Sequence, residues 1–351
     1  MAHQTATISS VGRRSARSLL WISRGLLISL VLVFVGLRAA GISVSLTAQS
    51  IIYLLGMVAL NLPHGGFEHA NNLWQRSTDF VTRYLTLFLL GVALFISLLF
   101  WNPALGLGLA LVVAMVKGGH GGLQVLDATY NAREYYSRFR WLLAGFVRGG
   151  AVMLVPMVAW PSTFYMFSQY MANIFQMGAL TAAGSHLETV RLGIGILYGS
   201  ALVLHLGLGY LAQGGATVWQ VEALETLLLA TYFTVVPVVV AVGLYFPAWY
   251  SIRQMARATA TKDDAFAASI ARSDDPPLVA GLRTWGTFIV GAAATFALMG
   301  ALYLYVPNPL GGAAFWPGLV AFFSIFVSII ALPHIVVGAW LDRDRGIWYV
   351  P

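Results

Sequence analysis

Long apolar runs dominate this chain and restrict it to few folds. A helix needs about 20 apolar residues to cross a hydrocarbon core of ~30 Å, and nine runs approach or exceed that length. Apolar residues make up 59% of the sequence and charged residues only 9%. The runs are continuous rather than alternating, which favours helices over strands. The predicted spans are 18–37, 44–63, 84–101, 104–120, 141–161, 189–212, 222–250, 284–307 and 316–340.

We therefore predict an all-α fold, a polytopic transmembrane bundle of about eight to ten helices. One transmembrane domain is expected over residues 18–345, between an N-terminal tail, 1–17, and a C-terminal tail, 346–351. Its surroundings would be a lipid bilayer, which we expect to be the bacterial cytoplasmic (inner) membrane.

Arginines in the short loops predict the orientation, because basic loops stay on the cytoplasmic side. The groups are Arg13, Arg14 and Arg17; Arg76 and Arg83; Arg133, Arg138 and Arg140; and Arg253, Arg257, Lys262 and Arg272. The last group needs an even number of crossings before it, whereas seven are predicted. Either Phe164–Ala183 is an additional span, or Glu222–Tyr250 breaks at Pro237. With this correction both termini are cytoplasmic.

Charge and cysteine content narrow the possible chemistry. The net charge of +7 lies in membrane-flanking loops rather than on one basic face, so we expect no nucleic-acid partner. Cysteine is absent, which excludes disulfides, thiolate catalysis and cysteine-ligated metal centres. The side chains left as metal ligands are His, Asp and Glu.

Three histidines at the ends of apolar runs are candidate metal ligands. His64 and Glu68 are four residues apart, so a continuous helix would present both on one face. His120 ends another run on the same predicted side, and His334 lies about two turns before Asp342. The alternative is that His64 hydrogen-bonds to a neighbouring helix and Glu68 is an interfacial residue.

Other ionisable residues in apolar segments have simpler interpretations. His205 has no charged neighbour in its own helix, so an interhelical hydrogen bond is favoured over metal ligation. Arg148 lies deep and should pair with a carboxylate on another helix, either Glu222 or Glu225. Asp127, together with Gln124, could accept hydrogen bonds from behind the metal ligands. His3 and His186 are expected at the solvent or interface.

These residues resemble the Brp/Blh family of membrane β-carotene 15,15′-dioxygenases, which supply retinal to microbial rhodopsins. The resemblance covers most of the chain from about residue 50. Its carriers are Leu-Pro-His-Gly-Gly at 62–66, His120, His205, the stretch from Glu225 through Pro237 to Tyr245-Phe246, and Leu-Pro-His-Ile-Val-Val at 332–337.

The family resemblance implies an all-helical bundle with histidine-bound Fe(II), an apolar tunnel for a polyene, and cleavage of its central double bond by dioxygen. One departure is important. Where the family has His-Ser-x-Arg-His, this chain has Tyr250-Ser251-Ile252-Arg253-Gln254, so two expected iron ligands are replaced. Neutral amide and phenol oxygens bind a borderline divalent metal less well than imidazole.

Two functions therefore remain open. The first is an iron-dependent carotenoid oxygenase with a reduced ligand set of His64, His120, His334 and Glu68. The second is a non-catalytic subunit that binds a carotenoid or other isoprenoid within a membrane pigment–protein complex. In both, Tyr250 and Gln254 should face inward on one side of their helix, Arg253 should turn toward the cytoplasmic surface, and Asp127, His205 and Arg253 would support the site or pack.

Overall fold

The computed structural model describes residues 10–61, 78–261 and 293–342, with the isolated positions 279 and 286. Within these ranges every regular element is helical, which confirms the predicted all-α bundle. The elements are α1 (Ser10–Ala39), α2 (Leu46–Leu54), η1 (Leu55–Asn61), α4 (Thr78–Trp101), α5 (Pro103–Tyr130), η2 (Ala132–Tyr135), α6 (Arg138–Ala159), α7 (Pro161–Asn173), η3 (Thr181–His186), α8 (Leu187–Gln213), α9 (Thr217–Val235), α10 (Val238–Tyr245), η4 (Phe246–Ser251), α11 (Ile252–Thr261), α14 (Ala293–Tyr305) and α15 (Phe315–Asp342).

Six of the described helices are long and apolar enough to cross a bilayer, as expected for a chain embedded in a membrane. They are α1, α4, α5, α6, α8 and α15, and each corresponds to one of the predicted apolar runs. Capping residues define several of their ends. Asn102 caps α5 ahead of Pro103, Ser137 caps α6, and Gly214 ends α8 in the left-handed conformation at φ +59°.

The sequence left two explanations for the odd number of crossings predicted before the last basic group, and the structure supports one of them. The run Glu222–Tyr250 does break at Pro237, because α9 ends at Val235 and Val236 and Pro237 are extended before α10 begins. Phe164–Ala183 is not an additional span. Its helix, α7, has 13 residues, and at ~1.5 Å per residue it is too short to cross the hydrocarbon core.

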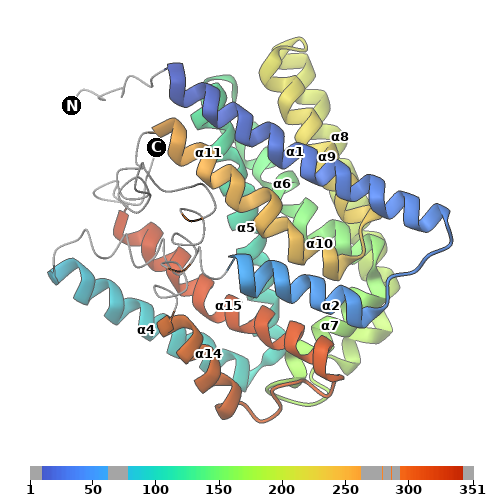
Figure 1. The fold of residues 1–351 in the computed structure, drawn as a ribbon, viewed down its shortest axis with the longest axis vertical. Helices are drawn as coiled ribbons and strands as arrows, with labels where there is room; N and C mark the ends of the chain where they lie inside the picture. The colour runs from blue at the N-terminus through green and yellow to red at the C-terminus, as the bar shows by residue number, and fades with distance from the viewer. Residues whose placement is uncertain (1–9, 62–77, 262–278, 280–285, 287–292, 343–351) are drawn as a thin grey trace.

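Figure 1 shows α1 and α11 side by side across one face, with α4, α14 and α15 gathered at another side of the bundle. Two apolar cores follow this arrangement. One is centred on α4 and α15, and the other fills the space among α6, α9 and α10. The candidate site lies where α5 packs against α11.

Glycines allow α5 and α6 to approach very closely. A Cβ atom on Gly119 would overlap the carbonyl oxygen of Gly145, and one on Gly149 would overlap the carbonyl oxygen of Met115. Small residues at a helix–helix contact of this kind are typical of membrane bundles. The close contact fixes α5, and with it His120, relative to α6.

We predict that Gly149→Ala destabilises the protein by about 1–3 kcal/mol, because the new methyl group pushes α6 away from α5. The matched control is Gly199→Ala on α8, where a Cβ would meet nothing within 4 Å. That change should be neutral or raise stability by up to about 1 kcal/mol through helix propensity. Thermal unfolding in detergent measures both, and equal midpoints would contradict the predicted contact.

Candidate functional site

The face between α5 and the continuous segment of η4 and α11 brings His120 close to the two substituted family positions, Tyr250 on η4 and Gln254 on α11. Tyr250 and Gln254 both pack against Gly121, the residue after His120. A Cβ on Gly121 would lie 3.2 Å from a ring carbon of Tyr250 and 3.3 Å from the Gln254 amide nitrogen. Tyr250 and Gln254 therefore share one helix face, as predicted, and that face is turned toward α5.

A short polar chain holds His120 in place. Arg257 on α11 donates to Gln124 Oε1 at 2.6 Å, and Gln124 Nε2 lies 2.8 Å from His120 Nε2. An amide nitrogen only donates, so His120 Nε2 is the acceptor and the neutral ring carries its proton on Nδ1. Gln124 thus contacts His120 directly, and a metal bound at Nε2 would have to displace it.

Two π-helical segments lie next to this face. η1 ends at Asn61 and η4 ends at Ser251, and the two segments pack against each other. Asn61 and Ser251 are joined by a hydrogen bond of 3.3 Å. π-Helical turns occur frequently at functional sites because they shift the side chains that follow them out of normal register.

Aromatic rings continue this region into the bundle. Tyr245 and Phe246 have centroids 5.3 Å apart, and Phe246 and Tyr250 are 5.8 Å apart, all in tilted or edge-to-face geometry. Phe233 of α9 extends the series at 5.5 Å from Tyr245. The Lys117 ammonium lies 5.9 Å from the Tyr250 ring centroid. The result is an aromatic stripe that begins at Tyr250.

The remaining predicted metal ligands are distributed as follows. His64 and Glu68 lie outside the described residues. His334 is on α15, where its Nδ1 is 2.7 Å from the Tyr84 hydroxyl of α4. Within the described part of the chain, no group of three His, Asp or Glu side chains could hold a metal ion. These described residues alone do not fit iron, so an iron site would need at least one ligand from the parts of the chain outside the described ranges.

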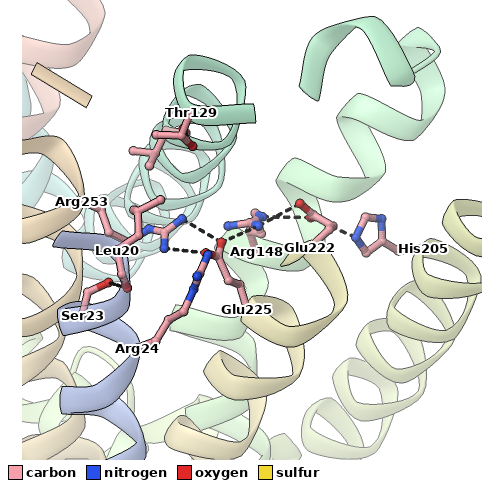
Figure 2. Close-up of polar contacts among 10 residues, drawn as sticks. Leu20, Ser23, Arg24, Thr129, Arg148, His205, Glu222, Glu225 and Arg253 are labelled. Atoms are coloured by element: carbon pink, nitrogen blue, oxygen red, sulfur yellow. Dashed lines mark hydrogen bonds and ion pairs between the residues drawn. The ribbon is translucent and has the colours of Figure 1, made fainter. Parts of the chain in front are cut away.

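A buried ion-pair network forms the second notable feature of the bundle (Figure 2). At its centre is Glu225, whose side chain is 0% exposed. Its carboxylate accepts from Arg24 at 2.6 and 3.1 Å, from Arg148 at 3.0 Å, and from Arg253 at 2.7 Å through each oxygen. One carboxylate on α9 therefore joins α1, α6 and α11.

Glu222, one turn earlier on α9, extends the network to α8. Arg148 donates to its two oxygens at 2.9 and 2.8 Å, and His205 Nε2 lies 3.1 Å from Oε1. The structure thus confirms that Arg148 pairs with carboxylates, and that His205 makes an interhelical hydrogen bond. Arg24, Arg148 and His205 all lie within candidate spans, where charged groups are costly unless they are paired.

The structure contradicts one orientation expected from sequence. Arg253 does not turn toward the cytoplasmic surface, because its side chain is 2% exposed and forms the two-oxygen contact with Glu225. Trp249 also covers its guanidinium at 4.4 Å from the ring centroid. Asp127 is near the end of α5, where it accepts from the Arg133 backbone amide. Asp127 therefore closes the turn between α5 and α6.

Sequence reasoning missed Arg24 altogether. An arginine inside the first apolar run was a usable signal, because such a residue requires a partner. The pairing with Glu225 joins residues 201 positions apart, and periodicity carries no information on that contact. Gln124 was considered only as an accessory to a metal site, whereas it links Arg257 to His120.

The fold and the site together describe a helical membrane protein in which α5 carries His120 on the candidate site and Glu225 and Glu222 hold a buried ion-pair network. The profile described as "Beta-carotene 15,15'-dioxygenase" matches residues 55–342. The chain belongs to this family.

Named relatives span nearly the whole chain. It is 51% identical over 338 residues to "Probable beta-carotene 15,15'-dioxygenase Brp" of Halobacterium salinarum strains R1 and NRC-1, covering 95% of this chain and 94% of the relative. It is 30% identical over 316 residues to "Probable beta-carotene 15,15'-dioxygenase Blh" of strain NRC-1, covering 88% of each. No solved structure matches it.

We predict that Glu222→Gln lowers the free energy of unfolding by about 3–5 kcal/mol, because Arg148 loses a buried charge partner. Glu188→Gln is the control, since Glu188 pairs with Arg191 at the surface and its side chain is 76% exposed. Its cost should stay below about 1 kcal/mol. Thermal unfolding in detergent measures both variants, and equal stabilities would contradict a larger contribution from the buried Arg148–Glu222 pair than from the surface pair.

Proposed function

We propose that this protein oxidatively cleaves a carotenoid of the β-carotene type at its central double bond, giving a retinal-like product. The observation that carries the proposal is similarity over nearly the whole chain to proteins named as probable β-carotene 15,15′-dioxygenases. The aromatic stripe from Tyr250 through Phe246 to Tyr245 supports it, because a row of aromatic rings offers apolar surface to a long polyene.

In this proposal the face of α5 that carries His120 borders the reacting part of the polyene. Gln124 holds the His120 ring, and Arg257 holds Gln124. The apolar bundle would exclude water and keep the polyene in one orientation, which lowers the entropic cost of reaching the transition state.

We further propose that Fe(II) is held by His120 with His64, Glu68 and His334. Iron, when bound, would activate dioxygen beside the double bond. The chemistry of the donors supports this set only in part, because Gln124 occupies the His120 Nε2 position and Tyr250 and Gln254 replace two imidazoles.

The second candidate is a non-catalytic protein that binds a carotenoid or related isoprenoid, as a subunit of a membrane pigment–protein complex. The replacement of the two family histidines favours this second candidate, because Tyr250 and Gln254 fill the space beside Gly121 with neutral side chains. Such a protein would keep the aromatic stripe and the apolar bundle without retaining iron.

His64→Ala and His120→Ala are each expected to abolish iron retention and retinal formation, because each removes an imidazole ligand. His186→Ala is the matched control, since His186 is exposed at the end of η3 and should keep full iron content. Metal analysis of the purified proteins and retinal assay in β-carotene-producing cells provide the measurement. Equal iron in all three variants would reject the ligand set, and pigment without iron in the parent would favour the binding protein.

The double change Tyr250→His with Gln254→His should raise iron content and retinal yield, because it restores two imidazoles four residues apart on the face that borders Gly121. Met255→His adds an imidazole to the same helix at a position that is 48% exposed, and it should change neither quantity. If the parent already shows full iron occupancy and activity, the replaced pair is not a deficiency and a rearranged ligand set carries the reaction.

A further inference from the structure

We infer that Glu225 is a positioning residue for the candidate site: its contact with Arg253 sets the rotation of α11, and of the turn η4 that continues into it, and holds Tyr250 of η4 and Gln254 of α11 against α5. The inference rests on the proposed function, in which this face of α11 borders the polyene. Glu225 itself lies on α9 and acts only through Arg253.

The direction of the Arg253 side chain determines the directions of Tyr250 and Gln254, because all three lie on one continuous helical segment. Arg253 and Gln254 are adjacent on α11, with side chains ~100° apart around its axis, and Tyr250 lies on the π-helical turn η4, which runs directly into α11. Because η4 and α11 are continuous, a rotation of α11 about its axis also turns η4 and moves all three side chains. With Arg253 directed at α9, Tyr250 and Gln254 are directed at Gly121 of α5, as observed.

The contact between Arg253 and Glu225 resists rotation because two guanidinium nitrogens bind two different carboxylate oxygens. Arg253 Nη1 bonds to one carboxylate oxygen and Nη2 to the other, each at 2.7 Å. A paired contact of this kind fixes direction as well as distance. The Trp249 ring, 4.4 Å from the guanidinium carbon, restricts Arg253 from another side.

Glu225 is in turn held by two helices that do not belong to the candidate site. Arg24 of α1 and Arg148 of α6 bond to the same carboxylate. An ionised carboxylate has about four acceptor positions, and here it accepts five N–H contacts. Glutamine has one acceptor oxygen, and its amide group would face arginine donors, so it cannot reproduce this arrangement.

Thiol cross-linking tests the inference without substrate, since the chain has no cysteine of its own. The reporter pair is Gly121→Cys with Gln254→Cys, which spans the α5–α11 contact. The reference pair is Gly118→Cys with Val152→Cys, which spans α5 and α6, where a Cβ on Gly118 lies 3.7 Å from a Val152 methyl. Each pair is introduced into the parent, Glu225→Gln and Glu222→Gln backgrounds, and membranes are treated with a short bifunctional thiol reagent.

The expected result is that Glu225→Gln slows cross-linking of the reporter pair by roughly tenfold and leaves the reference pair unchanged. Glu222→Gln should leave the reporter pair unchanged, because Glu222 bonds to α6 and α8 and not to α11. Equal rates in the parent and Glu225→Gln would overturn the inference. Equal loss at both pairs would also overturn it, because that is the behaviour of general destabilisation.

A second variant covers the case in which Glu225→Gln does not accumulate. Arg253→Met removes the same contact but leaves Glu225 bonded to Arg24 and Arg148, and it should slow only the reporter pair. Retinal assay of these variants separates the two proposals. Selective loss of the reporter cross-link in a protein that never cleaves β-carotene would support the positioning role and reject the proposed function.

Discussion

The arrangement of the helices depends on one interaction, the ion pairing of the Glu225 carboxylate with Arg24, Arg148 and Arg253. A charge inside a membrane protein is tolerated only when it is paired and hydrogen-bonded, and Glu225 meets this condition by binding arginines from three helices. The geometry is restrictive, since a shift or rotation of α1, α6 or α11 would leave a buried charge without its partner. Buried ion pairs often add little net stability, but removing one partner is costly because it leaves the other charge buried without compensation.

The buried ion-pair network and the candidate site share helices. α6 carries Arg148 and also the glycines that allow α5 to approach, while α11 carries Arg253 and Gln254 and continues directly from η4, which carries Tyr250. Position is therefore transmitted from the network to His120 by rigid contacts rather than by a flexible loop. The π-helical turns η1 and η4 adjust the register locally, next to the residues whose direction matters most.

The sequence was sufficient for the helices and insufficient for their contacts. Apolar runs predicted the long spans because hydrocarbon imposes a length on every crossing. The break at Pro237 was one of two alternatives, and the structure selects it because proline interrupts helical hydrogen bonding. A requirement for a carboxylate identified the partners of Arg148. Arg253 was misassigned because a basic residue near a predicted helix end usually turns to water, whereas only the three-dimensional position of Glu225 shows that it turns inward.

Electrostatics around His120 bears on the choice between catalysis and binding. Lys117 lies beside the Tyr250 ring, and Arg257 is two hydrogen bonds away from the imidazole, so positive charge approaches this face from both helices. A divalent cation is disfavoured near such charges unless a carboxylate offsets them, whereas a neutral polyene is not. In the proposed ligand set Glu68 is the one carboxylate, so iron binding would depend on its charge more than in a site built from histidines alone. If the proposed ligand set is correct, the replacement of two imidazoles on η4 and α11 would leave His64 and Glu68 to provide much of the binding energy for the cation.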